Sequence, residues 1–176
     1  MNLEDMRIAA QLHVGISMEK PFARRFANEA MIQLCNLYPK TVMRKKKENI
    51  DAVGGEETTL PQDCYLLTKV KKGDRVETDY EIYGDTLEFE RSGTYTIEYL
   101  KKPDPLGTES DVPQMPEAFH PSIALFIASR EKFRLFGEED VDSIRLMREF
   151  AETASLANTM VSKHGRRRMI KPREWW

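Results

Sequence analysis

Cysteine and histidine, which build most metal centres and thiol active sites, are scarce in this chain of 176 residues. The two cysteines, Cys35 and Cys64, have no CxxC spacing, and the three histidines have no second ligand at helical spacing. The absence of these ligand spacings argues against a metal site, and the small number of cysteines argues against a disulfide framework. We predict that both cysteines are small core residues in a reduced, cytosolic environment.

Long apolar runs and catalytic motifs are also missing. No segment approaches the roughly 20 apolar residues that cross a bilayer, and acids occupy the first residues, where a signal peptide would be basic. The Gly54-Gly55 pair lacks the lysine and hydroxyl residue of a phosphate-binding loop. We therefore expect a non-enzymatic protein with no catalytic residue, metal, cofactor or membrane partner. A small enzyme with its site in the β-rich part of the chain remains an alternative.

Four stretches repeat apolar residues at three- and four-residue spacing, which predicts four helices. They cover residues 3–14, 21–38, 117–136 and 138–162. Gly15 and Gly137 fit the ends of helices, and Pro21 fits a first helical turn, where its missing N–H costs nothing. In the first helix, Ile8 and Leu12 widen the apolar side.

Between the second and third helices, the sequence changes to short segments rich in β-branched and aromatic residues. They cover residues 64–70, 76–83, 86–90 and 94–100, and glycine-containing turns separate them. Strict alternation in Thr94–Leu100 indicates one buried and one solvated face. We predict one small antiparallel sheet of three or four strands that ends before Pro103. Arg44–Lys47, which precede it, are interpreted as a basic run followed by a loop.

The fourth predicted helix carries two apolar stripes. The first consists of Val141, Ile144, Met147, Ala151, Ala154 and Val161, and the second of Leu146, Phe150, Ala157 and Met160. Together they form an apolar face that is wider than a plain surface helix needs. Our hypothesis is that one side packs within the chain while the second stripe contacts a neighbouring subunit. The alternative is a helix buried centrally in its own domain.

The end of the chain, residues 163–176, differs in charge from the rest. It contains six Lys or Arg and one acid, whereas the remaining residues include 21 basic and 28 acidic ones. Opposite signs predict that this tail meets an acidic surface on another molecule. The closing Trp175-Trp176 pair favours a protein pocket, because Trp and Arg dominate interface hot spots. The predicted docking residues are Lys163, Arg166, Arg167, Arg168, Ile170, Lys171, Arg173, Trp175 and Trp176.

Two alternatives to protein docking stay open. The tail is a frayed end whose tryptophans are accidental, or the chain is a nucleic-acid-binding regulatory protein. In the second case the basic segments would contact phosphates. Those segments are Arg44, Lys45, Lys46 and Lys47, together with Arg166–Arg168. No helix-turn-helix, zinc-finger or aromatic-studded RNA-binding pattern accompanies them.

Four segments occur in an order that is known from one protein family. They are Leu34–Pro39 (LCNLYP), Thr59–Cys64 (TLPQDC), Tyr95–Pro105 (YTIEYLKKPDP) and Met115–Ala124 (MPEAFHPSIA). Over about residues 20–160, the chain resembles the head-to-tail adaptor, or neck, proteins of tailed bacteriophages.

The resemblance implies an α+β fold, in which an antiparallel helical bundle carries an inserted small antiparallel β-domain and an extended C-terminal tail. The N-terminal helices and basic loop would cover residues 1–58, and the β-domain residues 59–105. The C-terminal helices that complete the bundle would cover residues 106–162, and the docking tail residues 163–176.

The resemblance also implies a virion protein of the neck, at the head–tail junction, that is assembled in the host cytoplasm. Its copies would form a ring, usually of twelve, below the portal protein. The ring would extend the channel for genomic DNA without reading its sequence. It would also offer a platform to the next neck or tail component, which is a stopper, tail-terminator or nozzle protein. Family members add no catalysis, and their C-terminal segments reach into the portal.

Overall fold

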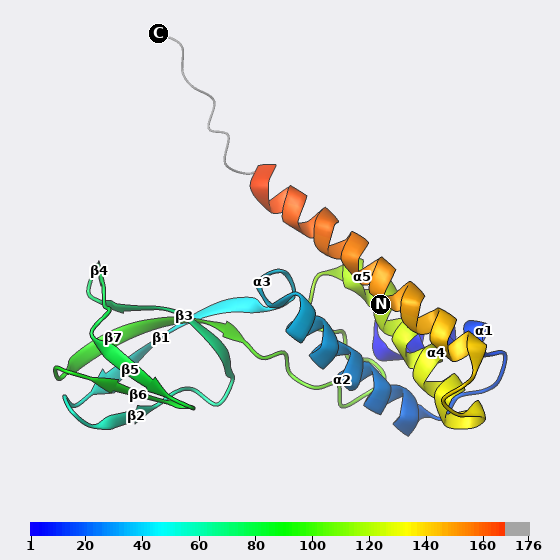
Figure 1. Ribbon diagram of the computed structural model, residues 1–176, viewed down its shortest axis with the longest axis horizontal. Helices are drawn as coiled ribbons and strands as arrows, with labels where there is room; N and C mark the ends of the chain where they lie inside the picture. The colour runs from blue at the N-terminus through cyan, green and yellow to red at the C-terminus, as the bar shows by residue number, and fades with distance from the viewer. Residues whose placement is uncertain (168–176) are drawn as a thin grey trace, which may run out of the picture. The chain divides into compact units, whose positions relative to one another are not determined.

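The protein folds into two units, one helical and one built from β-strands (Figure 1). The computed structural model describes the backbone of residues 1–167 and the side chains of residues 1–162. Within the described backbone, residues 1–42 and 104–167 form the helical unit, and Met43–Pro103 form the β unit. The predicted α+β class with antiparallel pairing is confirmed.

The β unit begins earlier in the chain than the sequence predicted. Its first strand is β1 (Arg44–Ala52), so the unit starts at Met43 and not at residue 59. The segment that we interpreted as a basic run and a loop is therefore a strand. It has no apolar alternation to indicate this, because β1 is an edge strand whose first four residues are exposed. Exposed lysines are common on edge strands, where they prevent pairing with other molecules.

In the fully described β unit, seven strands form two antiparallel sheets in place of the single predicted sheet. The larger sheet has the order β1-β7-β3-β4, and the smaller has the order β2-β6-β5. The remaining strands are β2 (Glu57–Thr59), β3 (Cys64–Lys72), β4 (Arg75–Val76), β5 (Tyr80–Tyr83), β6 (Thr86–Phe89) and β7 (Gly93–Lys101). Each predicted segment contains a strand, but residues 76–83 are divided between β4 and β5.

The core of the β unit depends on the alternation predicted for its last strand. Tyr95, Ile97 and Tyr99 of β7 are buried, and β7 lies between β1 and β3 in the larger sheet. Phe89 of the smaller sheet stacks on Tyr95, with ring centroids 4.0 Å apart. The two sheets therefore share one apolar core.

The helices begin and end close to the predicted positions. They are α1 (Leu3–Val14), α2 (Lys20–Leu37), the short α3 (Pro39–Val42), the 3-10 helix η1 (Glu117–Phe119), α4 (His120–Phe136) and α5 (Val141–Arg167). Gly15 ends α1 with a φ of 76°, in the left-handed region that favours glycine. Asp140 begins α5, because its carboxylate accepts a hydrogen bond from the N–H of Ser143 at 2.7 Å.

The end of α5 corrects the predicted start of the tail. The helix continues to Arg167, past the expected end at residue 162, so residues 163–167 belong to its backbone. Lysine and arginine are good helix formers, and cations are favourable at the negative C-terminal end of a helix. An extended segment therefore does not begin at residue 163.

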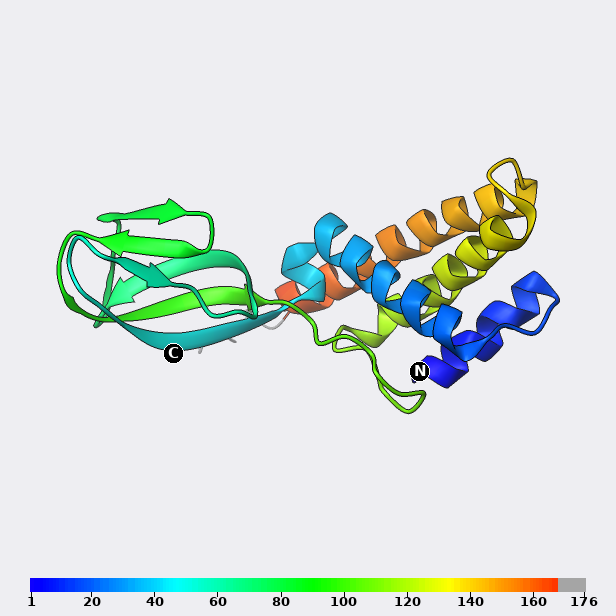
Figure 2. The same cartoon turned by 90° about the horizontal axis from the view of Figure 1, so that it is seen from below.

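The central helix of the helical unit is α4, against which α1, α2 and α5 all pack. Its residues 122–124 and 126–129 are buried, as expected for a helix that is covered on several sides. The two views place α1 and α5 on opposite sides of α4 (Figure 2). The outer faces of α1 and α5 therefore point in different directions.

Candidate functional site

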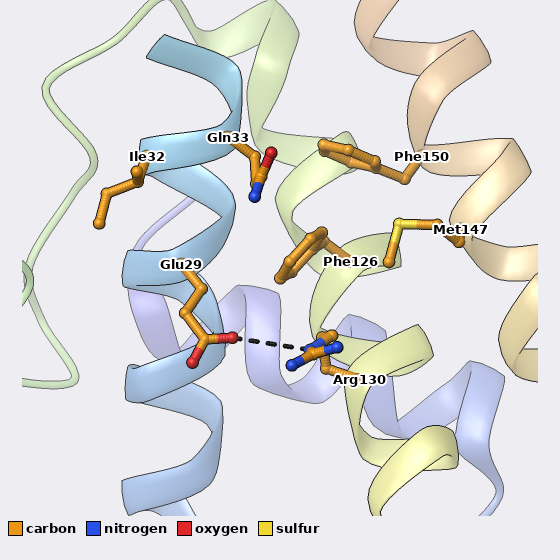
Figure 3. A pocket seen from close by; sticks show the side chains of 7 residues that line it. All are labelled: Glu29, Ile32, Gln33, Phe126, Arg130, Met147 and Phe150. Atoms are coloured by element: carbon orange, nitrogen blue, oxygen red, sulfur yellow. Dashed lines mark ion pairs between the residues drawn. The ribbon is translucent and has the colours of Figure 1, made fainter. Parts of the chain in front are cut away.

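A groove opens on one side of the helical unit between α2 and α5, with α4 as its floor (Figure 3). One part has a volume of about 410 Å³ and is lined by Glu29, Ile32 and Gln33 of α2, Phe126 and Arg130 of α4, and Met147 and Phe150 of α5. A second part, of about 430 Å³, also contains Arg130 and Met147 and extends to Ile144 and Arg148. We call the two parts together the α2–α5 groove.

Aromatic and charged side chains build the floor of the groove. Phe126 and Phe150 are buried and meet edge to face, with ring centroids 5.2 Å apart. The Arg130 guanidinium lies over the ring of Phe133, 5.2 Å from its centroid. Its Nε atom is 3.6 Å from Oε2 of Glu29, so Arg130 also connects α4 to the wall formed by α2 (Figure 3).

Polar contacts hold α5 in place along the groove. Near its first turn, the buried Ser129 and Ser143 each donate a hydrogen bond to the other's backbone oxygen, at 2.8 and 3.0 Å. Further along the helix, the Thr41 hydroxyl of α3 donates to Oδ1 of Asn158 at 2.7 Å. The small side chains of Ser129 and Ser143 let α4 and α5 approach closely near the first turn of α5. The groove is thus a preformed feature of the helical unit.

The two stripes of α5 do not divide between core and surface as predicted. Leu146, Phe150 and Ala157 are buried in the helical unit, so these three pack in the core and present no surface to another subunit. The fourth member of that stripe, Met160, is exposed. In the stripe assigned to internal packing, Ala154 is buried as expected, but Ile144 is 53% exposed and lies at the rim of the groove. Helical spacing shows both stripes but cannot tell which of them faces α4.

A second exposed apolar surface lies on α1. Leu12 is 82% exposed and Ile8 is 48% exposed, one helical turn apart, and Ile16 follows just beyond the helix end. We call Ile8, Leu12 and Ile16 the α1 ridge. The ridge was not predicted as a candidate site, although Ile8 and Leu12, which widen the apolar side of this helix, were visible in the sequence. The opposite side of α1, which carries Met6 and Ala10, is buried.

The predicted basic contact site, Arg44–Lys47, lies on β1 and is partly neutralised within the β unit. Lys46 Nζ is 3.1 Å from both Glu48 Oε2 and Asp63 Oδ2. Lys47 Nζ is 3.1 Å from Glu98 Oε1, which Lys71 also reaches at 3.0 Å. These two lysine contacts hold the pKa of Glu98 down at about 2. Half of the basic run therefore pairs with carboxylates of its own sheet.

The buried Tyr99 belongs to the same cluster. Its hydroxyl lies 2.7 Å from Asp63 Oδ1 and 3.0 Å from Glu48 Oε2. The hydrogen bond from this hydroxyl is the main cause that lowers the pKa of Asp63, and the hydrogen bond from Lys46 lowers it further. Burial raises the pKa of Tyr99, so the phenol remains a proton donor at neutral pH. All four residues of the run are exposed, but within the described residues Arg44 and Lys45 have no ion-pair partner. Their contact with DNA or a partner stays a prediction.

The predicted docking tail falls mostly outside the described residues. Lys163, Arg166 and Arg167 lie on the described backbone of α5, but their side chains do not belong to the described part. The remaining tail residues, Arg168, Ile170, Lys171, Arg173, Trp175 and Trp176, lie outside it altogether. Docking by this segment stays a prediction from charge and composition.

The described residues offer little for catalysis. Among them, no group of three or more His, Cys, Asp or Glu side chains is placed to hold a metal ion. Cys35 is buried as predicted, and burial raises the pKa of its thiol to about 11, so it is protonated at neutral pH. A cleft of about 560 Å³ in the β unit is lined mainly by apolar residues such as Leu60, Leu66 and Ile82. Its titratable lining residues include Asp85 and Cys64.

No protein-family model and no curated protein sequence matches this chain. Within residues 1–167, no helix has an apolar stretch long enough to cross a membrane.

Proposed function

We propose that this chain is a structural, non-enzymatic subunit of the neck of a tailed bacteriophage. In this role several copies form a ring below the portal protein and join the capsid to the tail. The observation that carries the proposal is the pair of exposed apolar surfaces on the helical unit, the α1 ridge and the α2–α5 groove. The resemblance of the four sequence segments to head-to-tail adaptors supports the same role.

The arrangement of these surfaces suits a ring subunit. They differ from each other and belong to α1 on one side of α4 and to α5 on the other (Figure 2). Two different surfaces generate head-to-tail contacts, which close into a ring or extend into a filament. An inserted β unit adds a separate body for contact with the next neck or tail component, a stopper, tail-terminator or nozzle protein.

The remaining features of the proposal follow from this position. The helical unit is taken to be a bundle, and the ring extends the channel through which genomic DNA passes without sequence recognition. Residues from Arg168 onward provide the docking segment for the portal. The protein functions in the virion, at the head–tail junction, after assembly in the host cytoplasm.

Deletion of residues 168–176 tests the docking segment while retaining the described backbone of α5. We expect the shortened chain to keep its circular dichroism spectrum and melting temperature but to lose capture by immobilised portal protein. A variant with Arg44→Gln and Lys45→Gln is the control, and we expect it to bind the portal normally. Portal capture by the shortened chain at wild-type affinity would contradict the role of the tail.

The same proteins test the nucleic-acid alternative. A regulator that uses Arg44 and Lys45 would bind duplex DNA with an affinity that falls steeply with salt and falls again in the double variant. We expect only weak DNA binding, equal in the wild type and the variant. Tight DNA binding that depends on these two residues would favour the regulator over the adaptor.

A further inference from the structure

We propose that the α1 ridge of one copy packs into the α2–α5 groove of a second copy. This inference rests on the proposed ring and names the surfaces that would join its subunits. Ridge and groove belong to the same helical unit, so each copy offers both halves of the contact. The occupant of the groove is therefore another copy of this chain.

The shapes of the two surfaces fit each other. Ile8 and Leu12 are one turn apart, which places their side chains about 6 Å from each other along one line of α1. The groove is bounded by two helices and floored by a third, and a ridge of this kind is what packs into such a space. Each part of the groove has one exposed apolar side chain at its edge: Ile32 of α2 at the part between α2 and α5, and Ile144 of α5 at the part between α4 and α5, each 53% exposed.

The position of the ridge prevents a copy from filling its own groove. In the close view of the groove, α1 passes behind α4, on the side away from the opening (Figure 3). The ridge points outward from that side, because Met6 and Ala10 on the other face of α1 are buried. The contact is thus heterologous: each copy gives its ridge to one neighbour and its groove to another.

One pair of charges at the edges of the two surfaces is complementary. Asp5 is exposed one turn before Ile8 on the same face of α1. On the groove side, Arg148 and Glu138 both border the outer part, and Arg148 has no ion-pair partner among the described residues. An acid beside the ridge and an unpaired arginine beside the groove favour contact between copies.

The contact is tested with one variant for each surface. Leu12→Asp places a charge on the ridge, and the double change Ile32→Asp with Ile144→Asp places charges on both walls of the groove. All three positions are at least half exposed, so the isolated copies should fold normally, as thermal unfolding would verify. Val76→Asp, on an equally exposed residue of the β unit, is the matched control.

Sedimentation equilibrium of the full chain at concentrations up to about 1 mM is the measurement. We expect concentration-dependent association of the wild type and the control. Because full burial of one leucine is worth about 1.5–3 kcal/mol, the ridge variant should associate roughly 10- to 100-fold more weakly. The groove variant should lose at least as much affinity.

An equimolar mixture of the ridge and groove variants distinguishes this contact from other modes of association. The intact ridge of one variant still fits the intact groove of the other, so the mixture should form dimers and nothing larger. A monomeric wild type, wild-type association of either variant alone, or a mixture that stays monomeric would each overturn the inference. Portal capture is measured separately: if it persists while self-association fails, the proposed function stands and the ridge–groove contact does not.

Discussion

At the scale of single residues, burial assigns different roles to side chains that look alike in the sequence. Phe150 is 4% exposed and packs on Phe126, whereas Ile144, two turns earlier on α5, stands at the rim of the groove. Helical spacing alone presented both as members of apolar stripes. Their contributions to stability should therefore differ sharply.

Phe150→Ala should lower the free energy of unfolding of the helical unit by about 3–5 kcal/mol, because it leaves a cavity against Phe126. Ile144→Ala should change it by no more than about 0.5 kcal/mol, because the side chain is largely solvated. Urea unfolding followed by the helical circular dichroism signal measures both. Equal losses in the two variants would show that the stripes are wrongly assigned to core and rim.

His120, at the start of α4, gives stability a pH dependence. Its side chain is almost completely buried, and burial lowers its pKa below the ordinary value of 6.5. Below pH 6.5 the unfolded chain binds a proton that the folded chain does not, so stability falls as the pH is lowered toward the folded-state pKa. This contribution is fully present above pH 6.5.

The change His120→Gln should therefore flatten the dependence of melting temperature on pH below about 6.5. His13, which is exposed near the end of α1, is the matched control, and His13→Gln should leave the wild-type slope unchanged. An undiminished slope in the His120 variant would mean that other groups cause the acid sensitivity.

At the scale of secondary-structure elements, the sequence predicted those helices and strands whose apolar residues recur at a regular spacing. Helices were found with bounds close to those of the structure, because Gly15, Pro21 and Gly137 mark their ends. β1 was missed because it is an edge strand whose first four residues are exposed, so it has no apolar alternation. Its antiparallel pairing with β7 is not visible in a linear pattern. The second sheet was missed because its strands, β2, β5 and β6, are each four residues or shorter.

The hydroxyl of Tyr99 on β7 connects Glu48 of β1 with Asp63. Tyr99→Phe removes the hydroxyl beside Asp63 and Glu48, and we expect a loss of about 1.5–3 kcal/mol in the stability of the β unit. Tyr95→Phe is the comparison, since its hydroxyl donates to the backbone oxygen of Arg91 and accepts from Lys72 Nζ, at 3.2 Å, but is hydrogen-bonded to no carboxylate. The loss of stability caused by Tyr95→Phe should be smaller, about 0.5–1.5 kcal/mol as measured by thermal unfolding. A larger loss of stability in Tyr95→Phe than in Tyr99→Phe would show that the Tyr99 hydroxyl is not the main polar support of the β unit.

At the scale of the whole molecule, the candidate site depends on tertiary contacts that the sequence did not determine. Leu146 and Ile144 lie two residues apart, and only the packing of α5 on α4 decides which one is buried. The α2–α5 groove combines residues from three helices that are distant in the sequence. The α1 ridge, by contrast, was visible as an extra apolar side of one short helix, because it lies on a single element.

The central claim is that this chain forms a ring on a portal. It is tested most directly by electron microscopy of the purified protein mixed with the portal protein encoded in the same genome. We predict a ring of this chain stacked coaxially on the portal, with an open channel continuing through both. Portals that remain bare while the added protein stays folded and dispersed would contradict the account.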